Sequence, residues 1–146
     1  MLMHWKTTIA TLAIYQGVKN KKDGMPMATP VIAAMNAIGD SKTPFNVMIF
    51  ERQTKKIASK VSGETIVRSQ GGFNEPSKVY ADQALLIEFA CHNCKEFALD
   101  FYCYGLDNLM VKMKSRMNAI EDSNFENFYK PYMPSKFKLL ISELSK

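Results

Sequence analysis

The fold class of this chain depends on residues 43–69, TPFNVMIFERQTKKIASKVSGETIVRS. Three segments of this stretch have strand character. Phe45–Glu51 is apolar on both faces, Ile57–Val61 alternates in polarity, and Thr65–Ser69 is rich in β-branched residues. The connections between them are short and polar, as in hairpins. The sequence therefore predicts a three-stranded antiparallel sheet.

Helices are predicted on both sides of this sheet. Thr29 is placed to cap a helix that begins at Pro30 and ends at Gly39. A longer helix is expected to start near Ser77, with room for a break near His92–Cys94. Its apolar positions recur at steps of four and three, a stripe formed by Tyr80, Ala84, Ile87, Cys91, Cys94, Ala98, Phe101 and Gly105. The expected fold is α+β: an αβββα core, with helices packed on the three-stranded sheet and helical extensions at both ends.

The whole chain, residues 1–146, is predicted to form one domain, because single domains commonly run to about 100–200 residues. Residues 29–92 make up its core, and residues 1–22 contribute an amphipathic N-terminal helix. Residues 107–146 form a C-terminal helical extension, whose apolar positions include Met110, Met113, Met117, Phe137, Leu140, Ile141 and Leu144. Short helices are marginal alone in water, so we expect this extension to pack on the stripe or on another subunit.

The N-terminal apolar run, Ile9–Val18, is too short for a membrane span, and lysines follow it where a signal peptide would have a cleavage site. Three cysteines are an odd number and do not make a disulfide framework. Free thiols suit a reducing compartment. We therefore expect an intracellular protein, in the cytoplasm, with no membrane partner.

The net charge of +5 suits a polyanionic partner without requiring one. Its distribution is uneven. The segment Gln83–Met110 has one base against four acids, and the positive excess lies in residues 19–22, 55–60, 112–116 and 130–138. Positive charge is thus expected at the periphery of the most apolar segment. The cations of residues 112–116 suit either a phosphate-contacting surface or a solvated helix face.

The order of helix, three antiparallel strands and helix over residues 29–92 resembles the double-stranded-RNA-binding domain. Several local features resemble that family in register. Thr29-Pro-Val31 is similar to the start of its first helix, and Thr43-Pro-Phe45-Asn-Val47 is similar to its first strand. The pair Gly71-Gly72 precedes SKVYADQA, residues 77–84, which is similar to the start of its last helix. The resemblance covers less than half of the chain.

The resemblance implies a surface that recognises the shape and charge of A-form RNA. Its contacts would come from Asn36 in the first helix, Lys55 and Lys56 in the first hairpin, and Ser77 and Lys78 at the start of the last helix. The departures are substantial, because Val79 and Asp82 replace two of the three family lysines. Loss of these charges implies weak RNA binding, and reversal of the charge at Asp82 would restore part of it.

Two groups of residues suggest a metal or catalytic site, but each has a simpler interpretation. Cys91 and Cys94 lie on the apolar stripe, which favours buried thiols over a zinc site. Glu88, His92 and Glu96 recur every four residues and so share one helix face. They could form a metal-binding or acid–base row, but no further acid, base or nucleophile is placed to complete a site, and a solvated face explains them equally. The sequence predicts no catalytic residues, no metal and no cofactor.

The leading hypothesis is a non-catalytic RNA-associated protein, a subunit of a larger complex, that binds structured or double-stranded RNA together with a protein partner. The alternative is a protein-interaction adaptor without RNA binding. Exposure of Lys55, Lys56 and Lys78 on one face would favour RNA. Uncharged apolar side chains exposed on the helices would favour the adaptor.

Overall fold

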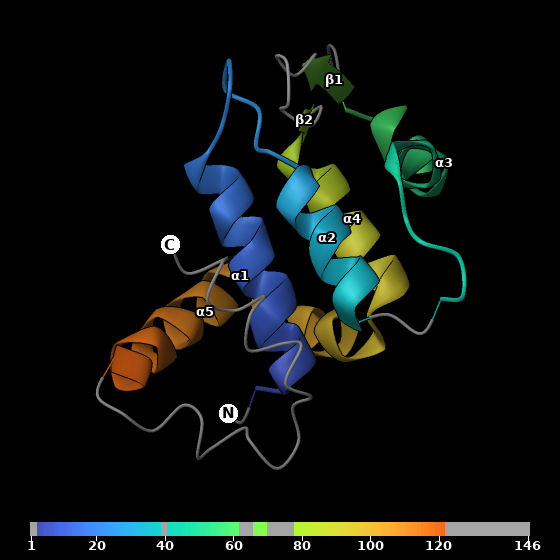
Figure 1. Cartoon of the computed structure of the whole chain (residues 1–146). Helices are drawn as coiled ribbons and strands as arrows, with labels where there is room; N and C mark the ends of the chain where they lie inside the picture. The colour runs from blue at the N-terminus through green and yellow to red at the C-terminus, as the bar shows by residue number, and fades with distance from the viewer. Residues whose placement is uncertain (1–2, 39–40, 62–65, 70–77, 122–146) are drawn as a thin grey trace.

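The computed structural model describes residues 3–38, 41–61, 66–69 and 78–121 (Figure 1). Most of these residues lie in helices: α1 (Trp5–Lys19), α2 (Thr29–Ile38), α3 (Val47–Ala58), α4 (Gln83–Asn93) and α5 (Lys95–Glu121). Two short strands, β1 (Ile66–Ser69) and β2 (Lys78–Ala81), pair antiparallel with Ile66 opposite Ala81. The fold is therefore mainly helical. The prediction of an α+β fold with a three-stranded sheet and an αβββα core is wrong.

The central element is α1, which lies between α5 and α2 (Figure 1). The His4 side chain caps it by accepting the Lys6 backbone N–H at 3.1 Å. Residues on several sides of α1 are buried, among them Ile9, Leu12 and Ile14. An amphipathic helix with one apolar stripe was expected, whereas α1 is packed on most of its surface as the core helix of the molecule.

The helix predicted from Thr29 is confirmed as α2, but Thr29 does not cap it as predicted. Its hydroxyl accepts the backbone N–H of Val79 at 3.0 Å and so ties α2 to β2. The preceding segment also binds β2: Ala28 donates to the Val79 carbonyl at 2.7 Å, and Ala81 donates to the Pro26 carbonyl at 3.0 Å. Lys78–Ala81 therefore has backbone partners on two sides, which favours a strand where a first helical turn was predicted.

The largest departure from expectation is α3. Its buried or core-packed positions are Val47, Phe50, Thr54, Ile57, Ala58 and Val61, which recur at steps of three and four. This is the period of a helix and not of a strand. The predicted strands over Phe45–Glu51 and Ile57–Val61 are consequently joined into one helix and its C-terminal turn, and the expected hairpin loop lies inside it.

The predicted break near His92–Cys94 is confirmed, since α4 ends at Asn93 and α5 begins at Lys95. The predicted stripe is wrong in α4, where Leu85, Leu86 and Phe89 are buried while Ile87 and Cys91 are only half-buried. Gly105 bends α5 with a φ of 76°, a conformation that favours glycine.

The predicted helices beyond residue 121 lie outside the described residues, as does the predicted helix end at Gly39. Among the helices that the structure describes, none is both long and apolar enough to span a bilayer.

Candidate functional site

The exposed face of α3 is set by a short sequence signal. Asn46 caps the helix, its side chain accepting the Ile49 backbone N–H at 2.9 Å. From that start, the helical period turns Phe50 into the core and Met48 toward solvent. Arg52 and Lys55 follow on the same side as Met48. We call Met48, Arg52, Lys55 and Lys56 the cationic face.

This helix is held firmly against α4. The ring of Phe89 packs edge-on against Phe50, with centroids 5.0 Å apart, and against Phe45 at 5.5 Å. The amide of Asn93 donates to the side-chain oxygen of Gln53 at 2.6 Å. An aromatic cluster and a polar contact on the buried side fix the rotation of α3, so the cationic face has a defined orientation.

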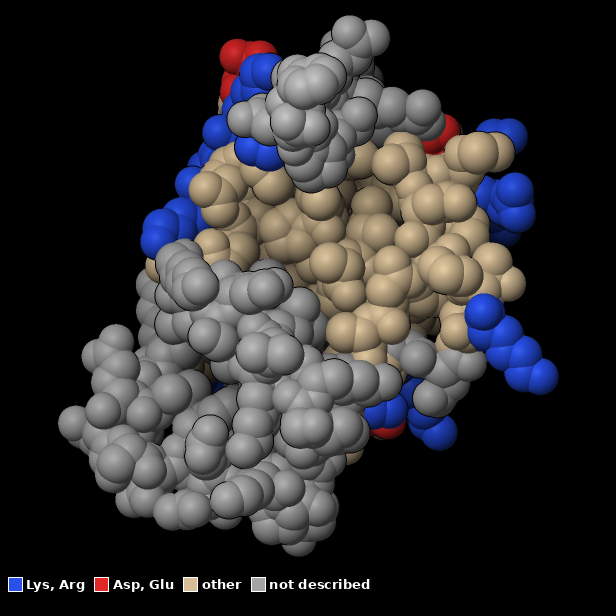
Figure 2. Space-filling view, in the orientation of Figure 1, with Lys and Arg blue, Asp and Glu red and all other residues tan. Residues whose placement is uncertain are grey.

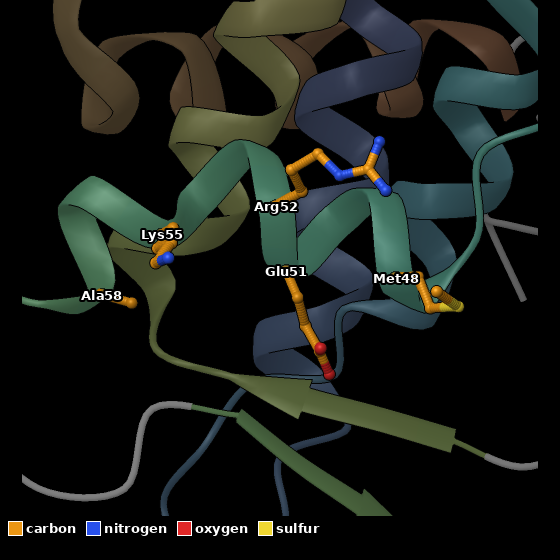
Figure 3. Close-up of a pocket in the computed structure, with 5 residues that line it drawn as sticks. All are labelled: Met48, Glu51, Arg52, Lys55 and Ala58. Atoms are coloured by element: carbon orange, nitrogen blue, oxygen red, sulfur yellow. The ribbon is translucent and has the colours of Figure 1, made fainter.

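A depression of about 510 Å³ runs along α3, lined by Met48, Glu51, Arg52, Lys55 and Ala58 (Figure 3). Figure 3 shows Glu51 extending toward the two strands, while Arg52 lies on the side of the helix away from them. Met48 lies at one end of the helix and Ala58 at the other, so two apolar ends flank the charged centre.

The charge of this region is positive. Arg52, Lys55 and Lys56 are all exposed, against the half-buried carboxylate of Glu51. Met48, one helical turn before Arg52, exposes 65% of its surface, a high value for a large apolar side chain. Figure 2 shows how positive charge is arranged elsewhere: Lys and Arg side chains lie along the margins of a broad uncharged face.

The structure places the residues proposed for RNA binding that it describes on three elements, α2, α3 and β2. Asn36 is committed to the loop before α3: its side chain accepts the Phe45 backbone N–H at 2.6 Å and donates to the Phe45 carbonyl at 3.0 Å. Lys55 and Lys56 lie in the last turn of α3, and Lys78 is the exposed first residue of β2. Ser77 lies outside the described residues. Asp82, predicted to repel phosphates, caps α4 by accepting the Ala84 backbone N–H at 2.9 Å.

Met48 and Arg52 were missed as site residues. Met48 was predicted inside the strand Phe45–Glu51, which is apolar on both faces, and Arg52 was predicted in the hairpin connection after it. The signal that would have found them is the helical spacing of Val47, Phe50 and Thr54 on the opposite side.

A second depression, of about 480 Å³, lies where α4 meets α5 and includes Cys91 and Cys94. Burial raises the pKa of each thiol to about 11, and the carboxylate of Glu88 adds to the effect at Cys91. At neutral pH both thiols are protonated and are weak nucleophiles. This region therefore lacks an activated cysteine.

The acidic residue of this region, Glu96, is already engaged. It lies 3.9 Å from the ammonium of Lys6 and 3.7 Å from the Cys94 sulfur. Burial alone would raise its pKa, but its own backbone N–H and the nearby Lys6 lower it overall. Within the part of the chain that the structure describes, no three His, Cys, Asp or Glu side chains are grouped to hold a metal ion.

No protein-family model, curated protein or solved structure matches this chain. What the protein binds is therefore inferred from the chemistry of its own surface.

Proposed function

We propose that this protein is a non-catalytic adaptor that binds an acidic segment of a partner protein through the cationic face of α3. The observation that carries the proposal is the placement of Met48, 65% exposed, beside Arg52 and Lys55 along one depression. A flexible thioether adapts to apolar side chains of a partner. The guanidinium group binds carboxylates in a bidentate manner.

This combination suits a protein partner better than RNA. Protein interfaces are enriched in methionine and arginine around an apolar centre. Double-stranded RNA presents phosphates and 2′-hydroxyls, whereas Met48 in the cationic face presents a large exposed apolar side chain. Asn36, to which the resemblance gives an RNA contact, already donates to and accepts from the Phe45 backbone.

Exposed apolar side chains on the helices were the sequence criterion that favours an adaptor. The structure contains one in α3, Met48, and one in the second half of α5, Val111, which exposes 68% of its surface. The exposed Lys55, Lys56 and Lys78 keep nucleic acid as the alternative partner to be measured.

The test compares two probes on the full chain by fluorescence anisotropy. One probe is a synthetic peptide with leucines on one helical face flanked by glutamates, and the other is a short RNA duplex. We expect the peptide to bind and Arg52→Glu to raise its Kd by about tenfold, because a charge-assisted contact becomes a repulsion. Met48→Asp should weaken the peptide to a similar extent.

Lys21→Glu is the matched control, since it makes the same charge change at an exposed lysine in the turn after α1. It should alter the Kd of the peptide by less than about twofold at physiological salt, where distant charges are screened. Equal effects of Arg52→Glu and Lys21→Glu would show non-specific charge attraction and reject the site. Tighter binding of RNA, abolished by the same variant, would assign the face to nucleic acid.

A further inference from the structure

The first half of α5 carries an unusual exposed surface. Leu99, Tyr102 and Cys103 are spaced i, i+3 and i+4, so they lie on one side of the helix, and all three are exposed. Leu99 and Tyr102 expose 57% and 77% of their surfaces. We call these three residues the α5 stripe. Contiguous exposed apolar side chains of this size mark a surface that another element covers.

The opposite side of the first half of α5 packs against α1. Phe97 is fully buried, and the Thr7 hydroxyl of α1 donates to Asp100 at 2.7 Å. The ring of Phe101 stacks against Phe97 with centroids 5.9 Å apart. Since α1 occupies this side, the α5 stripe is the surface left for a further element.

The C-terminal sequence has the complementary pattern. Phe137, Leu140, Ile141 and Leu144 are spaced i, i+3, i+4 and i+7, so a helix over this segment has one apolar side. Glu96 and Asp100 of α5 contact Lys6 and Thr7 of α1, so the match between the segment and the stripe is one of apolar side chains.

The chain is long enough for the segment to reach the stripe. Along α5, the path from Cys103 to Glu121 is at most about 27 Å. Residues 122–136 span up to about 45–50 Å when extended. A segment that begins at about Phe137 can therefore fold back beside Leu99 and Tyr102.

We propose that residues 137–144 dock on the α5 stripe of the same chain as an intramolecular helix. The proposal is independent of the cationic face of α3. It replaces the expectation that the C-terminal extension packs on the predicted stripe from Tyr80 to Gly105. That stripe does not form one buried face in α4, where Ile87 and Cys91 are only half-buried.

Cys103 is a native reporter of this docking, because it is exposed and lies within the stripe. The rate of its alkylation by iodoacetamide is measured in the full chain by mass spectrometry of the Cys103 peptide. A docked segment should protect the thiol, and Leu140→Asp should raise the rate by about tenfold or more, the factor by which undocking exposes it. Ser142→Asp places the same charge on the other side of the segment and should leave the rate unchanged.

Equal rates in wild type and Leu140→Asp would overturn the proposal. Protection that grows with protein concentration would assign the stripe to a second copy of the chain and would also overturn it. The buried Cys94 reports in the same sample whether Leu140→Asp remains folded.

If that variant unfolds, oxidative cross-linking decides instead. Ile141→Cys should form a disulfide with Cys103 within the monomer when treated with diamide, and Ser142→Cys should form it far more slowly. Equal yields for the two variants, or disulfide-linked dimers in place of the monomeric product, would reject the docking.

Discussion

Single side chains decide where the helices of this protein begin. Asp82 was interpreted from the sequence as a repulsive charge beside Lys78, because its hydrogen-bond partner could not be known. In the structure it is the N-cap of α4. Thr29 shows the reverse case: it was predicted to be a cap, and its hydroxyl instead accepts the backbone N–H of Val79. Capping residues are recognisable by type, but their partner depends on which backbone lies nearest.

The role of Asp82 predicts the effect of changing it. Asp82→Lys should lower the free energy of unfolding by about 1–2 kcal/mol, since the cap is lost and a cation is placed at the positive end of the α4 dipole. Asp82→Asn retains a capping oxygen and should stay within about 0.5 kcal/mol of wild type. Urea unfolding monitored by circular dichroism measures both. A lysine variant as stable as wild type would contradict the role of Asp82 as the cap.

At the scale of elements, helices with strong end signals could be predicted and the ambiguous ones could not. The start of α2 followed from Thr29-Pro30 and from an apolar body, and the break before Lys95 was foreseen. In contrast, α3 was predicted as two strands, because its apolar residues Val47, Ile49 and Phe50 fit either period over so short a window. β2 was missed for another reason: one of its partners, the segment 26–28, is distant in the sequence.

The packing of α1 on this distant segment depends on Gly17. Its carbonyl accepts the Met27 backbone N–H at 2.9 Å, and a Cβ at this position would collide with the Met27 carbonyl oxygen. Gly17→Ala should therefore lower the free energy of unfolding by about 1–3 kcal/mol. By helix propensity alone, alanine in place of glycine would raise the free energy of unfolding by up to about 1 kcal/mol. Helix propensity and packing therefore predict changes of opposite sign in this free energy. Thermal unfolding of Gly17→Ala distinguishes the two effects. A variant more stable than wild type would show that α1 and the segment 26–28 are not in backbone contact.

For the whole molecule, the sequence indicated which segments are positively charged but not which face carries them. Lys55 and Lys56, from one of these segments, lie in α3, which packs on α4 of the acidic segment 83–110. Lys55 and Lys56 were selected for the wrong structural reason, as parts of a hairpin loop, but they are exposed in the proposed interface. Met48 and Arg52 could be identified only after the helical period of α3 was established.

The most direct test of the proposed function is an NMR titration of the full, isotopically labelled chain with the leucine–glutamate peptide. We predict that backbone amide shifts change along α3, strongest near Met48, Arg52 and Lys55, and that the amides of α5 change little. Positive Cα secondary shifts over Val47–Ala58 would confirm the helix in the same sample. Shift changes confined to α5, or strand-like Cα shifts over Val47–Ala58, would contradict a partner site on α3.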